Sequence, residues 1–330
     1  MLRPPHQSFF KHAPVFIGAA FCTATLLLTA CERREPPEWE FPPETTTSAG
    51  TETSRAQPPV SPESWRLLSY NLKNWLTMER GGQPASKPEA EKHAAVRLIA
   101  HHRPDVLGVC EIGTPADLAD LRERLAAHGL DLPHFVHHGG ADPVRHLGLL
   151  SRFPVIRTDK APQTTYQLSG TTHGIQRGIL DATLQIGSDR YRLLGVHLKS
   201  RLDTPGADQA HMRLEEARLL RTHIGAILRD APATRLIVYG DFNDTRDSTT
   251  FHTVNAALHC LPLKDQRSET WTYRWTVPET YSRIDFVFTA PALKASFDPG
   301  NSRVIDDSEW SLASDHRPLL VTFRYFEPFE

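Results

Sequence analysis

The chain has 330 residues, of which 39% are hydrophobic and 23% are charged, a composition typical of a soluble globular protein that can bury a core. Five of the 37 Lys and Arg residues and seven of the 39 Asp and Glu residues precede Trp65, which leaves 32 of each sign and no net charge on the remainder. A neutral body gives no strong electrostatic attraction for nucleic acid, although local basic patches are compatible with it. The 17 histidines give no indication of zinc, because no CxxC or paired Cys/His spacing accompanies them.

Residues 1–30 have the pattern of an export signal. Arg3 and Lys11 precede an apolar run at 13–30, which is too short for a comfortable membrane span. The run leads into LTAC, which resembles the lipobox of bacterial lipoprotein signal peptides. This resemblance implies that Cys31 is lipidated and that the protein is an exported lipoprotein of the bacterial cell envelope, periplasmic or on the outer surface. The alternative is a buried hydrophobic helix, which the basic start and the terminal cysteine disfavour.

Residues 31–64 are rich in Pro, Thr, Ser and Glu and cannot bury enough apolar area to offset the entropy of ordering. We therefore predict that they form a tether. From residue 65 onward strand and helix patterns alternate, which predicts a layered α/β domain. No internal repeat or second linker follows, so we expect one domain over 65–330.

The elements follow one another as short apolar strands and amphipathic helices. Helices are expected at 87–104, ending at Pro104, at 114–129, at 208–229, and in a short segment capped by Ser248. The second of these has Thr114 as N-cap, Pro115 in the first turn and Gly129 at its end. Strands are expected at 65–71, 105–112, 147–155, 178–186, 191–200, 234–243, 281–288 and 317–326.

Two cysteines, Cys110 and Cys260, remain in the predicted domain. In an exported protein they could form a disulfide. Because Cys110 lies inside an apolar strand, where free thiols are common, we favour two free thiols, and the pairing stays open.

Polar side chains interrupt the apolar strands at one recurring place, at or just past the strand end. Ligands of layered α/β proteins gather at one edge of the sheet, where strand ends converge. We therefore expect these residues to form one oxygen-rich site: Asn71, Glu111, His197, Lys199, Asp241, Asn243, Asp285, Asp315 and His316.

Each of these residues also has a simpler explanation. Asn71 could end a turn, Glu111 could be a solvated strand end, and His197 could be a semi-buried structural histidine. Asp241 and Asp244 could cap the following turn. Taken singly, the simpler explanation is favoured, but six strand ends that all carry such groups are hard to explain by chance.

Eight segments look like successive motifs of the endonuclease/exonuclease/phosphatase superfamily, the group around pancreatic deoxyribonuclease. They occur in the family's order over residues 70–323: SYNLKN, PDVLGVCEI, LLSRFPV, QRGIL, GVHLKS, VYGDFND, SRIDFVF and SDHRPLL. GDFN and SDHRP are the most specific of them. The resemblance implies a four-layered α/β sandwich of two packed, mainly antiparallel or mixed sheets with helices outside. It also implies cleavage of phosphate esters with a divalent cation, usually Mg²⁺, or Mn²⁺ or Ca²⁺.

The resemblance also implies roles for a metal site and a water site. Glu111 resembles the main metal carboxylate, with Asn71 beside it and Asp315 close by. A hard cation such as Mg²⁺ needs only one or two protein oxygens because it keeps several waters. Asp241 and Asn243 match the pair that orients or deprotonates the attacking water.

The remaining matched residues are implied to act on the phosphate. Asp285 and His316 resemble a carboxylate–imidazole pair in which the acid orients the ring and favours its cation. His197 matches the position that donates to the phosphate or protonates the leaving oxygen. Arg177 and Lys199 are implied phosphate contacts, although basic residues after a loop are often only solvated.

Two features depart from the family pattern. Cys110 stands where the family often has Gln, which we expect to affect supporting hydrogen bonds only. The loops at 137–146 and 160–176 match no motif, and loops of this kind choose the substrate in such folds.

The sequence therefore predicts an exported, lipid-anchored, metal-dependent phosphoesterase, attached to the membrane through Cys31 and monomeric. Our first hypothesis is a phosphodiesterase that acts as a nuclease. The alternative is a phosphatase or phospholipase-C-like esterase acting on a lipid or small phosphate ester, which the neutral body and the anchor support. A non-catalytic binding module with the same fold is a second alternative, disfavoured because the matched catalytic positions are all retained.

Overall fold

The computed structural model describes residues 64–202 and 207–325. The predicted signal peptide, Cys31 and the predicted tether up to residue 63 lie outside these ranges. In the described part of the chain, no helix is both long and apolar enough to cross a membrane.

Two six-stranded sheets form the centre of the fold. The first contains, in spatial order, β17 (Phe297–Val304), β18 (Leu319–Arg324), β1 (Ser64–Trp75), β4 (Val106–Ile112), β6 (His146–Ser151) and β5 (His134–His138). The second contains β13 (His259–Cys260), β16 (Asp285–Thr289), β12 (Arg235–Asp241), β11 (Asp189–His197), β10 (Ile179–Ile186) and β7 (Val155–Asp159). Each sheet has a single parallel pair, β1 with β4 and β11 with β12, and antiparallel pairs elsewhere.

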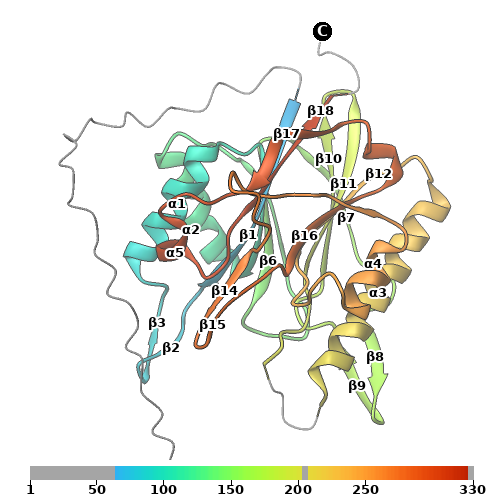
Figure 1. The fold of residues 1–330 in the computed structure, drawn as a ribbon, viewed down its shortest axis with the longest axis horizontal. Coiled ribbons are helices and arrows are strands. Elements are labelled where there is room, and N and C mark those ends of the chain that lie inside the picture. The colour runs from blue at the N-terminus through green and yellow to red at the C-terminus, as the bar shows by residue number, and fades with distance from the viewer. Residues whose placement is uncertain (1–63, 203–206, 326–330) are drawn as a thin grey trace, which may run out of the picture. The chain divides into compact units, whose positions relative to one another are not determined.

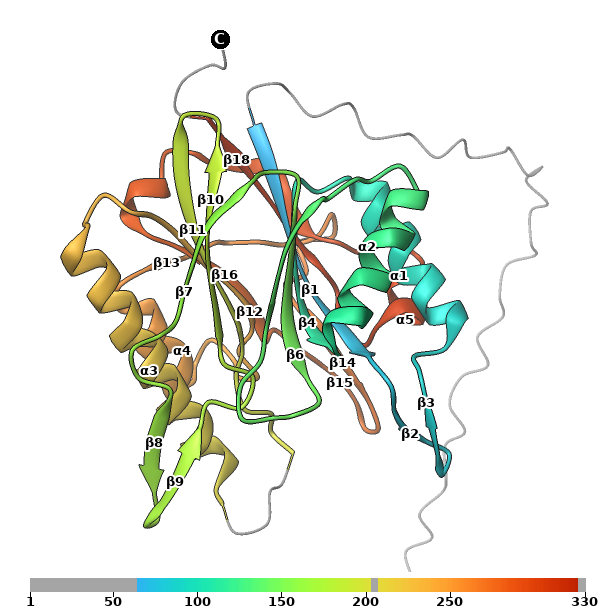
Figure 2. The same ribbon diagram turned by 180° about the vertical axis from the view of Figure 1, so that it is seen from behind.

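Helices cover the outer face of each sheet (Figures 1 and 2). The first sheet is covered by α1 (Glu89–His102), α2 (Pro115–Ala127) and the short α5 (Trp310–Ala313). The second is covered by α3 (Gln209–Asp230) and α4 (Thr249–Asn255). Three small hairpins project from this frame: β2 and β3 (Met78–Arg80, Gln83–Ala85), β8 and β9 (Thr165–Leu168, Thr171–Gly174), and β14 and β15 (Tyr273–Thr276, Glu279–Ser282). A 3₁₀ turn, η1 (Pro291–Leu293), follows β16. The predicted four-layered α/β sandwich is confirmed.

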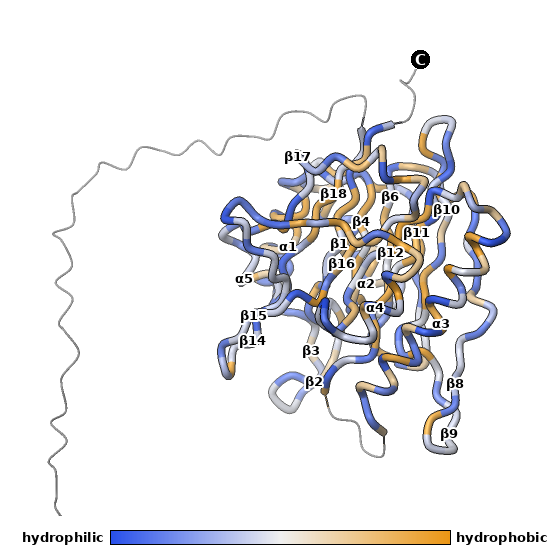
Figure 3. Tube along the Cα trace, turned by 45° about the vertical axis from the view of Figure 1, so that its right-hand side comes forward, coloured by the Kyte–Doolittle hydropathy of each residue, from blue (hydrophilic) through white to orange (hydrophobic). Residues whose placement is uncertain are grey.

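The layer between the sheets is the largest apolar core. Side chains from both sheets meet there, and the hydrophobic residues of the strands concentrate at the centre of the molecule in Figure 3. Trp65 stacks on Phe323 with ring centroids 4.9 Å apart and meets Tyr191 edge-on at 5.1 Å. Tyr239 of the second sheet lies on Gly108 of the first, where an added Cβ would come within 2.0 Å of the ring. The close approach of the two sheets therefore depends on a glycine at 108.

The predicted helix boundaries agree well with the structure. In α2, the Thr114 side chain accepts from the Asp117 amide and the Asp117 carboxylate accepts from the Thr114 amide, a capping box that satisfies two otherwise free donors. α1 ends at His102, one residue before the left-handed Arg103 and two before Pro104. The predicted helices at 208–229 and after Ser248 are α3 and α4.

Two predicted strands were wrong as single elements. Residues 147–155 divide into β6 and β7, which belong to different sheets. Pro154 cannot donate to a ladder, and the Arg152 amide binds the Asp105 carbonyl instead, so the chain leaves the first sheet at this point. Residues 281–288 likewise divide into the end of β15 and the start of β16.

Cys110 is buried and Cys260 is partly buried, and both are free thiols. The disulfide that the sequence left open is therefore not formed in the structure. Cys110 instead points its sulfur at the Val196 carbonyl of the opposite sheet, 3.4 Å away.

Candidate active site

Three of the expected residues form one row across the second sheet. His197 is the last residue of β11 and pairs in register with Asp241, the last residue of β12. Asp241 in turn pairs with Asp285, the first residue of β16. Because β11 and β12 are parallel and β16 is antiparallel to them, two strand ends and one strand start meet at the same edge. The sequence could place each residue near a strand end, but only the register places the three side by side.

The first sheet brings a second group to the same edge. Asn71 of β1 pairs with Cys110 of β4, one residue before Glu111. The Ser314 hydroxyl donates to the Asn71 carbonyl at 2.8 Å and thereby fixes the segment that carries Asp315 and His316. The two groups are joined directly, since the Asn71 amide nitrogen donates to the Asp241 carboxylate at 3.0 Å. One site thus spans the edges of both sheets.

A pocket of about 580 Å³ opens at this place. Its lining includes these expected residues: Glu111, Arg177, His197, Asp241, Asn243, Asp315 and His316. Asn71 and Asp285 lie behind the lining and touch it through hydrogen bonds to Asp241 and His316. Lys199 is not among the lining residues, and its ammonium group binds the carbonyls of Ser200 and Leu202 at 3.3–3.4 Å.

The backbone is strained at the residues that carry the chemistry. Glu111 has φ 61° and Asn243 has φ 50°, in the left-handed region that costs a non-glycine residue about 1 kcal/mol or more. The register of β4 shifts at Glu111, and this bulge turns its carboxylate into the pocket, where the Asn74 amide donates to it at 2.9 Å. Gly240, at φ 133°, directly precedes Asp241, and a Cβ there would lie 2.0 Å from the Val196 oxygen.

Asp241 lies at the centre of the site. Its side chain is almost fully buried and accepts from the Asn243 amide at 2.8 Å and from Asn71 at 3.0 Å. Burial and, after it, the charge of Asp285 raise the pKa of Asp241 to about 7, while the cation of His316 and the two hydrogen bonds act in the opposite direction. A carboxylate tuned toward neutrality is suited to accept a proton from water.

His316 is held as a cation. Its Nδ1 donates to Asp285 at 2.8 Å, and its Nε2 lies 3.8 Å from Asp241. Burial disfavours the charged ring, but the carboxylates of Asp285, Asp241 and Asp315 outweigh it and raise the pKa of His316 to about 10. The Tyr273 ring packs against the imidazole with centroids 4.7 Å apart.

His197 is neutral, in contrast to His316. It is buried, with Nε2 3.6 Å from Asp241 and 3.9 Å from Glu111. Burial and then the positive charge of Arg177 lower the pKa of His197 well below its usual value, so the ring is neutral. Two imidazoles in one pocket, one charged and one neutral, can serve different functions in the same reaction.

The oxygen donors of the pocket are of the type that a hard divalent cation prefers. The carboxylates of Glu111 and Asp315 both line the pocket, and a cation such as Mg²⁺ needs only one or two carboxylates beside its waters. Asn71 offers less, because its oxygen accepts from the Lys73 amide at 3.0 Å while its nitrogen faces Glu111 and Asp241. In this arrangement Asn71 orients the two carboxylates, and its role as a metal ligand stays a prediction.

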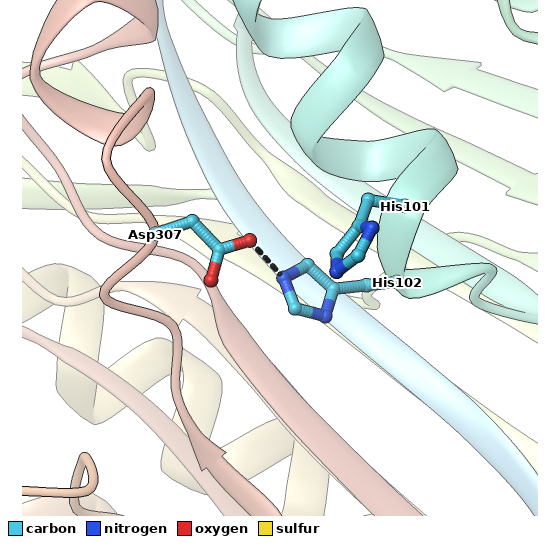
Figure 4. A group of neighbouring side chains, drawn as sticks. All are labelled: His101, His102 and Asp307. Atoms are coloured by element: carbon cyan, nitrogen blue, oxygen red, sulfur yellow. Dashed lines mark hydrogen bonds and ion pairs between the residues drawn. The ribbon is translucent and has the colours of Figure 1, made fainter. Parts of the chain in front are cut away.

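A second group of ligand-type side chains lies elsewhere, at the end of α1. The His102 ring contacts the Asp307 carboxylate at 2.7 Å, and His101 lies beside it (Figure 4). The other ring nitrogen of His102 faces the Arg303 guanidinium at 3.4 Å. A neighbouring guanidinium opposes a bound cation, so we interpret the contact as a structural link between α1 and the segment before α5.

The pocket carries more positive charge than the motifs indicated. Arg177 is only 6% exposed, its nearest carboxylate is Asp142 at 3.5 Å, and its Nε has no hydrogen-bond partner among the described residues. Lys73, Arg145 and Arg201 also line the pocket, and sequence reasoning missed all three. Arg145 and Arg201 lie in loops outside every motif, and Arg145 belongs to the unassigned loop at 137–146. Lys73 lies within SYNLKN near the end of β1, but the motif gave it no role.

Solved structures with the same fold include several hydrolases. Sphingomyelinase C from Streptomyces griseocarneus is 18% identical and has a TM-score of 0.54 over 79% of this chain and 99% of its own. The human Nocturnin catalytic domain with bound sulfate is 17% identical, with a TM-score of 0.57 over 80% of this chain and 95% of its own. Truncated TDP2 from Caenorhabditis elegans is 17% identical, with a TM-score of 0.54 over 79% and 98%. No curated protein matches the chain.

The fold and the site together place this chain in the class of phosphoester-hydrolysing enzymes. The sequence profile of the Endonuclease/Exonuclease/phosphatase family matches residues 68–316. The chain belongs to this family, as the motifs predicted, and the family is generally dependent on a divalent metal.

Proposed function

We propose that the protein hydrolyses phosphodiester bonds with the help of a divalent cation and acts as a nuclease. The observation that supports this best is that His197 and Asp241 line one pocket together with Glu111 and His316, while Asp285 binds His316 from behind. Acid, base and phosphate-binding groups are thus available within one site.

The roles follow from the charge states. Asp241 takes a proton from a water that Asn243 helps to orient, and the water oxygen attacks phosphorus while the bond to the leaving oxygen breaks. The leaving oxygen takes up a proton from solvent and departs as the alcohol. The cationic His316 stabilises negative charge on the phosphoryl group, and the neutral His197 donates a hydrogen bond to it. A cation held by Glu111 and Asp315 would neutralise charge that develops on the phosphate oxygens.

The purified protein should hydrolyse bis-p-nitrophenyl phosphate in Mg²⁺, and a chelator should stop the reaction. Replacing His316 by Ala should abolish most of this activity, because the variant lacks the only imidazolium of the described pocket. His252→Ala, an exposed histidine on α4 outside the pocket, is the matched control. Equal rates for wild type and His316→Ala would remove the catalytic proposal.

A lipid or small phosphate ester is the second candidate substrate. Trp275 and Leu202, which are 42% and 62% exposed, lie in the lining of the pocket, and Val277 extends the exposed apolar surface along the β14–β15 hairpin. Plasmid DNA, RNA, sphingomyelin and inositol phosphates should therefore be compared under the same conditions. We expect the highest turnover with a nucleic acid, and a clear preference for a lipid or an inositol phosphate would overturn the first choice.

We further propose that the protein is an exported lipoprotein, anchored through Cys31. The basic start, the apolar run and the LTAC sequence support this. In a bacterial host, Cys31→Ser should move the protein from the membrane fraction to the soluble fraction, with Cys22→Ser as the control. Unchanged partitioning of Cys31→Ser would refute the anchor.

A further inference from the structure

Helix α3 carries two buried charges that the proposed reaction does not use. One stripe of the helix, with Met212, Leu220 and Ile224, packs on the second sheet. Beside this stripe lie Arg213, 4% exposed, and Glu216, fully buried. Buried charges are costly unless they are paired and hydrogen-bonded, so their partners indicate what they stabilise.

Glu216 holds two separate loops at once. One carboxylate oxygen accepts from the Gln176 amide at 2.8 Å, and the other accepts from the Lys199 amide at 2.7 Å. Gln176 directly precedes Arg177, the buried guanidinium of the pocket, and Lys199 follows His197 by two residues. The same carboxylate therefore fixes the backbone beside a phosphate-binding cation and the backbone beside an imidazole of the site.

Arg213, one turn earlier on α3, completes the arrangement. Its Nη1 donates to the Lys199 carbonyl at 3.1 Å, so both polar groups of residue 199 are bound by side chains of the helix. Its Nε donates to Asp244 at 3.1 Å, and Asp244 also binds Arg201 of the pocket. The loop before β10 and the loops after β11 and β12 are thus tied to one helix.

The electrostatics agree with this geometry. Burial raises the pKa of Glu216 to about 7, while the two amide donors and the charges of Arg177 and Lys199 act in the opposite direction. The backbone amides replace the water that the carboxylate has lost, and the nearby cations balance its charge.

We propose that Glu216 is a positioning residue that sets Arg177 and His197 against the substrate phosphate. It does not touch the substrate, and it acts through the Gln176 and Lys199 amides. This inference rests on the proposed function for its effect on the reaction, while the loop anchoring itself can be measured without any activity.

Glu216→Gln tests the proposal in the full-length protein. The substitution keeps the shape but replaces one acceptor by a donor that faces a backbone amide, so one loop loses its anchor. We expect kcat/KM for bis-p-nitrophenyl phosphate to fall roughly 100-fold per folded molecule, the scale of a displacement of about 1 Å. Glu215→Gln is the matched control, since Glu215 pairs with Arg218 on the outer part of the same helix.

Two measurements separate positioning from a merely structural role. Amide hydrogen exchange should accelerate in Glu216→Gln at the one amide, of Gln176 or of Lys199, that then faces the side-chain NH2 group. Titration with inorganic phosphate should show weaker binding than in wild type. A lower Tm with unchanged kcat/KM and unchanged phosphate affinity would overturn the proposal. If wild type hydrolyses no phosphodiester, the proposed function fails, but exchange and phosphate binding still decide whether Glu216 anchors the anion-binding loops.

Discussion

Asp241→Asn should lower kcat by about 10³-fold while the protein stays folded, because the variant loses the group that accepts the proton from water. Asparagine has the same shape and can still accept from the Asn243 amide, which now binds Asp241 at 2.8 Å. It cannot take up a proton at neutral pH, and it removes one of the charges that stabilise the His316 cation. Single-turnover rates at saturating Mg²⁺ measure the chemical step directly.

Asp247→Asn is the control for this substitution, because Asp247 is exposed on the same loop and does not line the pocket. Asp247→Asn should unfold near the wild-type Tm. Asp241→Asn should unfold at a lower Tm but stay folded at the assay temperature, because its NH2 group replaces the oxygen that accepts from Asn71. An Asp241→Asn rate within threefold of wild type would show that another group activates the water.

Glu111→Gln should raise the Mg²⁺ concentration for half-maximal activity by about 100-fold. Gln keeps an oxygen in the bulge but removes a full negative charge beside the cation, a loss on the order of 3 kcal/mol at a partly screened site. Direct titration with Mn²⁺ measures the same affinity without relying on turnover. The hydrogen bond from the Asn74 amide can persist, so the fold should be retained.

Glu123→Gln, on the exposed face of α2, is the matched control for the charge change. If Glu111→Gln and Glu123→Gln bind Mn²⁺ equally well, the metal lies elsewhere, and Asp315 with Asp241 becomes the next site to test.

Much of the fold followed from local patterns. The Thr114 and Pro115 start of α2 and the apolar strand that ends at Asp241 were visible in the sequence because capping chemistry and buried runs are local signals. The break at Pro154 was missed because residues 147–155 are apolar on both sides of it, and only the pairing shows that the two halves enter different sheets. The strands β14 and β15 have only four residues each, too few for a pattern of alternation to identify them in the sequence.

The site was predictable as a set of residues but not as an arrangement. Family motifs named His197, Asp241 and His316, whereas their different pKa shifts arise from burial and from neighbours distant in sequence. Lys199 lies in a matched motif, yet its ammonium group faces the carbonyls of its own loop. Arg145 lies in no motif, and only the fold brings it to the pocket.

The hydrogen bond between Asn71 and Asp241 crosses from one sheet to the other. Each sheet supplies only part of the site: the first contributes Glu111 and His316, and the second contributes His197 and Asp285. Sliding one layer past its neighbour would separate acid from base even if every strand stayed intact. The close packing of Tyr239 on Gly108, deep in the interior, therefore fixes the position of one sheet on the other and keeps the catalytic groups at the sheet edge in register.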